Sequence, residues 1–201
     1  MTTYKAVLFD ADGVLTVHEA SFSAVYAREK NIDYSAFRDF FQGEFQQSLI
    51  GQADLKDLIR KHENLWQTNG KIDDLLARWF KTEDVRNEPL LRKVADLRHT
   101  NIPCYLATNQ EKYRGIHIVN EMFKDEFDGY FVSAVVGSKK PSRDFFLSVI
   151  ATISKEHPSV KPADILFIDD SLEHIEGAKA VGINAHLYES MPQVERLLAF
   201  Q

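Results

Sequence analysis

The sequence lacks the features of a disulfide-stabilised or membrane-spanning protein. Its 201 residues contain one cysteine, Cys104, so the chain cannot form an intramolecular disulfide. This cysteine lies in the apolar stretch 103–107, where a buried and unreactive thiol is expected. No apolar run approaches the length of a membrane span, and the first residues lack the charged-then-apolar pattern of a signal peptide. We therefore expect a cytoplasmic protein without a membrane partner.

The sequence also lacks an excess of basic residues. Lysine and arginine number 24 against 30 aspartates and glutamates, which gives a formal net charge of -6. No overall positive field would favour nucleic acid or an anionic membrane, so a small ligand is expected instead. With 44% apolar residues, the chain can bury a core as one domain with a large insertion or as two small domains. The composition leaves the oligomeric state open.

Short apolar runs alternate with longer helical patterns, which is typical of βαβ units and a parallel sheet. Strands are expected at Lys5 to Asp10, Cys104 to Asn109, Tyr130 to Val132, Ile165 to Asp170 and Asn184 to Tyr188. Helices are expected at Glu88 to Thr100, Lys112 to Met122, Arg143 to His157, Leu172 to Val181 and Pro192 to Phe200. Gly182 would cap the fourth of these helices. The predicted fold class is α/β, with a doubly wound, Rossmann-like parallel sheet.

The segment 17–87 has a different pattern. It contains no strand-like run, and its apolar residues recur at helical spacing, as between Leu55 and Trp66. We predict a small all-helical domain of about four helices at 17–87, inserted after the first strand of an α/β core domain formed by 1–16 and 88–201. An aromatic group is expected to pack these helices together: Phe37, Phe40, Phe41 and Phe45.

The most informative motif is the acidic pair Asp10 and Asp12, which follows the apolar run 6–9. Two carboxylates this close repel each other, so a chain keeps them mainly where a cation or a shared proton compensates their charge. The simplest competing interpretation is a solvated acidic turn. A calcium loop of the EF-hand type is excluded, because its twelfth position, counted from Asp10, is Ser21 instead of the required glutamate.

Further polar groups stand at or shortly after the ends of other predicted strands. In an open parallel sheet, ligands bind outside the carboxyl ends of the strands, so these groups should converge. Each has a local explanation as a turn, a surface charge or a helix cap, yet the local explanations together require several coincidences. The groups that should join Asp10 and Asp12 are Thr108, Asn109, Lys140, Asp169 and Asp170.

The charges at this edge favour phosphoryl transfer. Four carboxylates would repel a phosphate dianion, so a divalent cation is needed, and oxygen ligands point to Mg²⁺. Asp10 could then attack phosphorus and form an aspartyl phosphate. Asp12 could protonate the leaving oxygen and later deprotonate the attacking water. Thr108 and the backbone N–H groups after it would hold phosphoryl oxygens, and Lys140 would add positive charge.

With these motifs in this order, the chain resembles the haloacid dehalogenase-like (HAD) hydrolases. The resemblance rests on Asp-Ala-Asp-Gly-Val-Leu-Thr at 10–16, Ala-Thr-Asn at 107–109, Gly-Ser-Lys-Lys-Pro at 137–141 and Phe-Ile-Asp-Asp-Ser at 167–171. It spans the whole chain and implies that the helical segment is a C1-type cap. It also implies a nucleophile, Asp10, an acid/base, Asp12, and phosphate-binding residues Thr108, Asn109 and Lys140.

The resemblance implies Mg²⁺ as the cofactor. Its ligands would be Asp10, the backbone carbonyl of Asp12 and Asp170, with Asp169 beside or behind them. Lys140 is chosen over Lys139 because the family's lysine precedes the proline. For His174, hydrogen bonding or helix packing is expected instead of metal ligation, since the site already has enough oxygen ligands.

We therefore predict a Mg²⁺-dependent phosphatase for a small phosphorylated metabolite, such as a sugar phosphate or a nucleotide. Asp12 favours phosphate esters, because haloacid dehalogenases generally lack an acid at this position. A phosphomutase of the β-phosphoglucomutase type would keep Asp12, but its cap usually carries an arginine-containing stretch, and 50–53 has none. A signalling phosphoacceptor, or a noncatalytic binding protein built on a hydrolase fold, would also be compatible with a doubly wound sheet.

Overall fold

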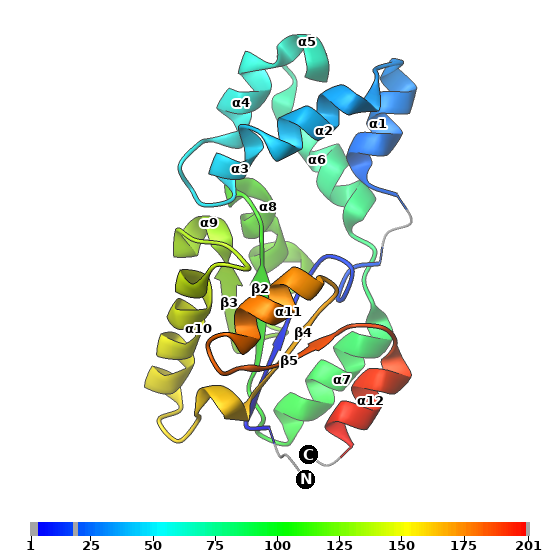
Figure 1. Ribbon diagram of the computed structural model, residues 1–201. Coiled ribbons are helices and arrows are strands. Elements are labelled where there is room, and N and C mark those ends of the chain that lie inside the picture. Colours follow the sequence, from blue (N-terminus) through cyan, green and yellow to red (C-terminus); the bar gives the residue numbers. More distant parts are fainter. Residues whose placement is uncertain (1–3, 18–19, 200–201) are drawn as a thin grey trace.

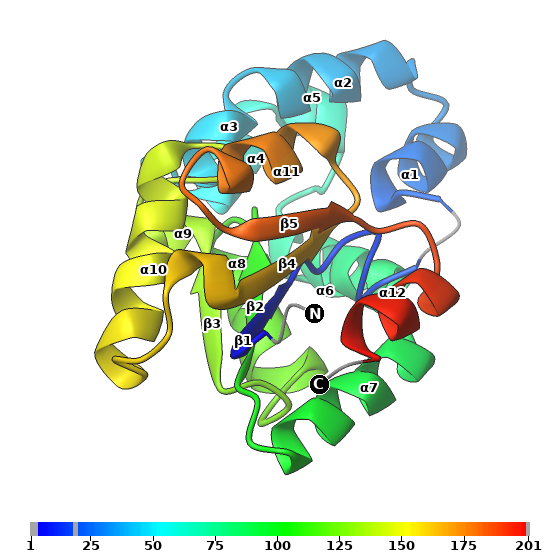
Figure 2. The same cartoon turned by 60° about the horizontal axis from the view of Figure 1, so that its bottom comes forward.

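The computed structural model describes residues 4–17 and 20–199. At its centre lies a five-stranded parallel sheet of order β3-β2-β1-β4-β5 (Figure 2). The strands are β1 Ala6–Phe9, β2 Cys104–Thr108, β3 Gly129–Val132, β4 Ile165–Asp169 and β5 Asn184–Leu187. The predicted α/β fold is confirmed. Four strands end one residue earlier than expected, because Asp10, Asn109, Asp170 and Tyr188 already belong to the loops that follow.

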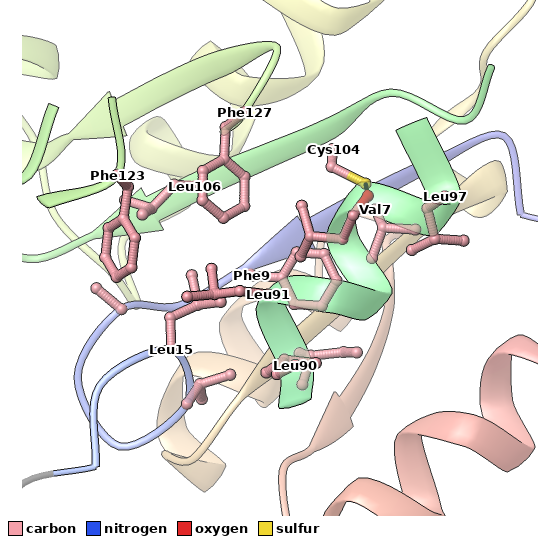
Figure 3. Close-up of a cluster of buried hydrophobic side chains, with 14 of the residues drawn as sticks. Val7, Phe9, Leu15, Leu90, Leu91, Leu97, Cys104, Leu106, Phe123 and Phe127 are labelled. Atoms are coloured by element: carbon pink, nitrogen blue, oxygen red, sulfur yellow. Dashed lines mark hydrogen bonds between the residues drawn. The ribbon is translucent and has the colours of Figure 1, made fainter. Parts of the chain in front are cut away.

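Helices cover both faces of the sheet (Figure 1). On one face, α7 Glu88–His99 and α12 Met191–Leu198 pack with Val7 and Phe9 of β1. On the other, α10 Arg143–Glu156 and α11 Leu172–Lys179 pack with Ala6 and Leu8. Alternate side chains of one fully buried strand therefore enter two separate apolar layers. Figure 3 shows the first layer, where the Cys104 side chain is buried as expected.

One core helix is divided in two, and another ends at a glycine cap. The helix expected at Lys112 to Met122 is divided into α8 Lys112–His117 and a π-helical turn at Ile118–Met122, a distinction that apolar periodicity does not make. After α11, Gly182 has a φ of +89° and its N–H bonds to the carbonyl of Lys179 at 3.0 Å. The predicted glycine cap is therefore confirmed. Phe200, the expected end of the last helix, lies outside the described residues.

The inserted segment is helical and stands beyond the carboxyl ends of the strands (Figure 1). About four helices were expected, and the described part of the segment has six, two of them only four residues long: α1 Phe22–Lys30, α2 Tyr34–Gln42, α3 Phe45–Ser48, α4 Leu55–Lys61, α5 Glu63–Trp66 and α6 Ile72–Glu83. Phe37 and Phe40 are buried between them, and Phe41 and Phe45 are partly buried against the same cluster. The predicted packing role of these four rings is confirmed. None of the helices in 4–17 and 20–199 combines the length and apolarity needed to cross a membrane.

The chain enters and leaves this helical segment through two adjacent linkers. The N–H of Val17 bonds to the carbonyl of Val85 at 2.8 Å, and the N–H of Asn87 bonds to the carbonyl of Leu15 at 2.8 Å. The Asn87 side chain also donates to the Val14 carbonyl at 2.8 Å. These bonds join the start of the insertion to its end, directly beside the loop that carries the acidic pair.

Candidate active site

Polar residues from distant stretches of the chain line one cavity of about 390 Å³ at the carboxyl ends of β1, β2 and β4. Its wall includes six of the seven predicted site residues: Asp10, Asp12, Thr108, Asn109, Lys140 and Asp170. Gly13, Thr16, Val17 and His174 complete the lining. The seventh predicted residue, Asp169, lies outside the lining and is fully buried.

Asp10 begins the loop after β1 and is 6% exposed. Its own N–H bonds to the Ile168 carbonyl of β4 at 2.9 Å, which fixes the start of the loop against the sheet. Its Oδ1 accepts from the Ala11 N–H at 2.7 Å and lies 2.6 Å from Lys140 Nζ. Burial raises the pKa of the Asp10 carboxyl, while the nearby Lys140 ammonium acts in the opposite direction.

Lys140 is 1% exposed and lies between two carboxylates. Besides Asp10, its Nζ contacts Asp169 Oδ2 at 2.7 Å. Burial acts to lower the pKa of Lys140, but the two carboxylates outweigh it and raise the pKa. Lys139 points elsewhere and bonds to Gln46 of the helical insertion. The geometry thus gives Lys140, and not its neighbour, the contact with the candidate nucleophile.

The environment of Asp169, which we expected beside or behind the metal ligands, is set by bonds within the protein. Its Oδ2 accepts from Lys140, and its Oδ1 accepts from the Ser171 N–H at 2.8 Å and lies 2.9 Å from His174 Nδ1. Burial acts to raise the pKa of Asp169, but the His174 hydrogen bond and the Lys140 charge lower it to about 2. Because both oxygens are bonded within the protein, Asp169 lies behind the site and positions Lys140.

The side chain of Asn109, an expected phosphate ligand, bonds to the backbone of Lys140. Its Oδ1 accepts from the Lys140 N–H at 2.8 Å, and its Nδ2 donates to the Lys140 carbonyl at 2.9 Å. Both ends of the side-chain amide are therefore occupied by the backbone of Lys140. Asn109 nevertheless lines the cavity together with Thr108.

Asp12 is oriented by two neutral donors. Thr16 Oγ1 donates to its Oδ1 at 3.1 Å, and Gln110 Nε2 donates to its Oδ2. Gln110 is in turn fixed by a bond from its N–H to Ser133 Oγ at 3.0 Å. Sequence reasoning did not pair Gln110 with Asp12. The one signal for this pairing was the place of Gln110 two residues after Thr108, at the same strand end.

Gly13 allows Asp170 to approach the acidic loop. Gly13 has a φ of +78°, and a Cβ built on it would lie 2.0 Å from Asp170 Oδ2. The position therefore requires glycine for its backbone conformation and for the space that the carboxylate fills. Incomplete solvation and the charge of Asp169 raise the pKa of Asp170.

The residues of the cavity fit a hard divalent cation. Three carboxylates line the cavity, those of Asp10, Asp12 and Asp170, whereas Lys140 is the one lysine or arginine among its described lining residues. Its donors are carboxylate and carbonyl oxygens, which suit Mg²⁺. Asp10, Asp169 and His174 also place ligand-type atoms within 4.8 Å of one another. In that trio, however, Asp169 and His174 are bonded to each other, which favours a hydrogen-bond network.

The profile of the haloacid dehalogenase-like hydrolases matches residues 4–182. The chain belongs to this family. A curated relative from Aspergillus oryzae, named a sesquiterpene phosphatase, is 34% identical over 94% of this chain and 93% of its own length. A drimenol cyclase of Aspergillus calidoustus is 33% identical over 74% of this HAD-like hydrolase, and the match spans 31% of the cyclase.

Solved structures show the same fold at lower identity. A HAD family enzyme of Bacteroides thetaiotaomicron superposes with a TM-score of 0.78 at 19% identity, covering 99% of both chains. The same enzyme in complex with magnesium and inorganic phosphate gives a TM-score of 0.77 at 19% identity, covering 95% of this chain and 98% of the other. At this identity, the similarity establishes the HAD fold of the present chain.

Proposed function

We propose that this HAD-like hydrolase is a Mg²⁺-dependent phosphatase that acts on a small phosphorylated metabolite. The observation that carries the proposal is the shared cavity, in which Asp10 and Asp12 face Thr108 and Lys140. This set provides a nucleophile, an acid/base and two phosphate-binding groups around one space. The buried pair of Lys140 with Asp10 supports a role in charge neutralisation.

The reaction takes place in two displacements. Asp10 attacks phosphorus, the bond from phosphorus to the ester oxygen breaks, and Asp12 donates its proton to the leaving alkoxide. Asp12, now a carboxylate, takes a proton from water. The resulting hydroxide attacks the aspartyl phosphate, and its phosphorus–oxygen bond breaks to release phosphate and regenerate Asp10. Thr16 and Gln110 hold Asp12 in one orientation for both proton transfers.

Mg²⁺ would be held by the carboxylates of Asp10 and Asp170 and the backbone carbonyl of Asp12, and would supply the positive charge that a phosphate dianion needs beside these groups. Thr108 and the backbone N–H of Asn109 would donate to phosphoryl oxygens. The helical insertion, residues 17–87, would act as a cap that limits access of water and bulky substrates. No nucleic acid or membrane partner is proposed.

The name of the Aspergillus oryzae relative adds a substrate class to those expected from the sequence. We therefore propose that phosphorylated terpenoid alcohols be assayed beside sugar phosphates and nucleotides. A phosphomutase is the second candidate, since it would use the same acidic pair. The absence of arginine from residues 50–53 supports the phosphatase.

The test uses the purified chain with p-nitrophenyl phosphate. Steady release of nitrophenol is expected with Mg²⁺, loss with EDTA, and recovery when Mg²⁺ is restored. Asp10→Asn should lower kcat by roughly a thousandfold or more, and Asp12→Asn by about 10²–10⁴-fold. Release of one equivalent or none would support a phosphoacceptor. Transfer of phosphate to a second position of a sugar phosphate, with no free phosphate, would support the mutase.

A further inference from the structure

Three aromatic rings form the accessible edge of the cap's apolar cluster. Phe41, Phe45 and Trp79 are partly buried, whereas Phe37 and Trp66 of the same cluster are fully buried. The Phe41 and Phe45 ring centroids lie 4.9 Å apart at 82°, and the Phe41 and Trp79 centroids lie 5.7 Å apart at 80°. We call Phe41, Phe45 and Trp79 the aromatic face.

Hydrogen bonds place one end of the aromatic face beside the lysine loop of the core. Gln46, the residue after Phe45, donates to the Phe41 carbonyl and accepts from Lys139. Lys139 precedes Lys140, which lines the cavity. The Phe45 end of the aromatic face is therefore linked directly to the loop that carries a cavity residue.

Hydrogen bonds place the other end beside the linkers. Trp79 Nε1 donates to Glu83 Oε2 at 2.8 Å, in the last turn of α6. Two residues further on, the Val85 carbonyl accepts from the N–H of Val17, which also lines the cavity. Figure 1 shows α3 and the C-terminal end of α6 at the side of the cap nearest the core. Residues near both ends of the aromatic face are therefore bonded, or adjacent in sequence, to the segments that carry the lining residues Lys140 and Val17.

On the core side, one apolar lining residue and one apolar neighbour in sequence of the lining are exposed. Val17 is 45% exposed, and Leu172, between the lining residues Asp170 and His174, is 61% exposed. Among the described residues that line the cavity, Lys140 is the one lysine or arginine. One lysine and one divalent cation suit a monophosphate better than a diphosphate, which would bring further negative charge to a site that already holds carboxylates.

We propose that the aromatic face binds the hydrocarbon tail of the substrate, a monophosphate ester of an apolar alcohol of isoprenoid size. This inference rests on the proposed phosphatase function and adds the substrate class and the residues that select it. The phosphate would occupy the cavity, and the tail would pass Val17 to cover Phe41, Phe45 and Trp79. Each methylene group of the tail that is buried against these rings would increase the affinity for the ester by about the same factor as the one before it.

The first experiment uses the unmodified chain with n-alkyl monophosphates from ethyl to dodecyl and with farnesyl monophosphate. The value of kcat/KM should rise by roughly two- to fourfold for each methylene until the aromatic face is covered, and then level off. Farnesyl monophosphate should exceed glycerol 3-phosphate and AMP by about a hundredfold or more. A flat chain-length series with steady turnover would overturn the tail site and leave the phosphatase function intact.

The second experiment locates the tail. Phe45→Ala should reduce the dependence of kcat/KM on chain length, with roughly a tenfold loss for the longest esters. Tyr34→Ala is the control, because Tyr34 begins the neighbouring α2 and is 46% exposed outside the cluster. Tyr34→Ala should retain the full dependence of kcat/KM on chain length. If Phe45→Ala and Tyr34→Ala change this dependence equally, the aromatic face is not the tail site.

A binding measurement separates this inference from failure of catalysis. In Asp10→Asn with Mg²⁺, dodecyl monophosphate should change Trp fluorescence with a Kd at least tenfold below that of ethyl monophosphate. Equal affinities would contradict the tail site. Loss of turnover for every ester in the unmodified chain, with tight dodecyl binding retained, would contradict the phosphatase function alone.

Discussion

Replacing Lys140 by methionine tests whether the site depends on the buried charge arrangement around this lysine. The substitution keeps an unbranched side chain of similar length and removes the ammonium that contacts Asp10 at 2.6 Å and Asp169 at 2.7 Å. Removing one partner of a buried ion pair leaves an uncompensated charge, which costs about 3–5 kcal/mol. For a chain of this size, that corresponds to a fall in Tm of roughly 6–20 °C.

The free energy of unfolding would be measured by urea denaturation in EDTA, so that no divalent cation replaces the lost charge. Lys139→Met is the matched control. Because Lys139 bonds only to the neutral Gln46 among the described residues, its loss should cost less than about 1 kcal/mol. Equal effects of the two substitutions, or a loss below about 1 kcal/mol in Lys140→Met, would refute the reasoning.

The pH dependence provides a second measurement on Lys140→Met. Burial raises the pKa of Asp10, and the Lys140 ammonium opposes this effect. Without Lys140, the pKa of Asp10 should therefore be higher still. A group whose pKa is higher in the folded state stabilises the protein below its unfolded pKa, and this contribution is lost as the pH rises through its folded pKa. The stability difference between Lys140→Met and the unmodified chain should therefore be smaller at pH 5 than at pH 7.

Three further predictions concern other parts of the molecule. Gly13→Ala should weaken Mg²⁺ binding at least tenfold by calorimetry, because the added Cβ would displace Asp170, a proposed ligand. Gly70→Ala is the control, because Gly70 has a φ of +81° and nothing within 4 Å of the added Cβ. It carries the same backbone strain and should leave Mg²⁺ binding unchanged. Burial raises the pKa of the Cys104 thiol to about 12, so this thiol should react with Ellman's reagent at pH 8 only after the chain unfolds. Rapid reaction of the folded chain would contradict this prediction. Tyr113→Phe removes a 2.7 Å bond to Asp54 of the cap and should cost about 1 kcal/mol in urea denaturation, whereas no loss would make this core–cap contact unimportant.

The strands, and the polar residues that follow them, could be predicted because both have local signals in the sequence. β1 is buried on both faces, so it reads as an uninterrupted apolar run, and the acidic residues that follow mark its end. The convergence of Asp10, Thr108 and Asp170 then followed from the rule that parallel strands place their carboxyl ends at one edge. These inferences needed no knowledge of side-chain direction.

The contacts within the site depend on information that spacing does not contain. Asn109 and Asp169 both stand at the expected strand ends, yet one bonds to the backbone of Lys140 and the other to its ammonium. Which way a side chain turns at the end of a strand depends on the φ and ψ values of the loop and on what the neighbouring loop offers. The pairing of Gln110 with Asp12 depends on the same unpredictable geometry.

The adjacent linkers have a consequence for how such a protein can change. Since Val17 and Val85 are hydrogen-bonded to each other, the insertion leaves the core at almost the point where it returns. A short turn, or an unrelated helical module with neighbouring ends, could replace it without moving β1 or α7. Selectivity for a new compound could therefore be acquired by exchanging one module, while the reacting groups stay on a scaffold that never has to be rebuilt.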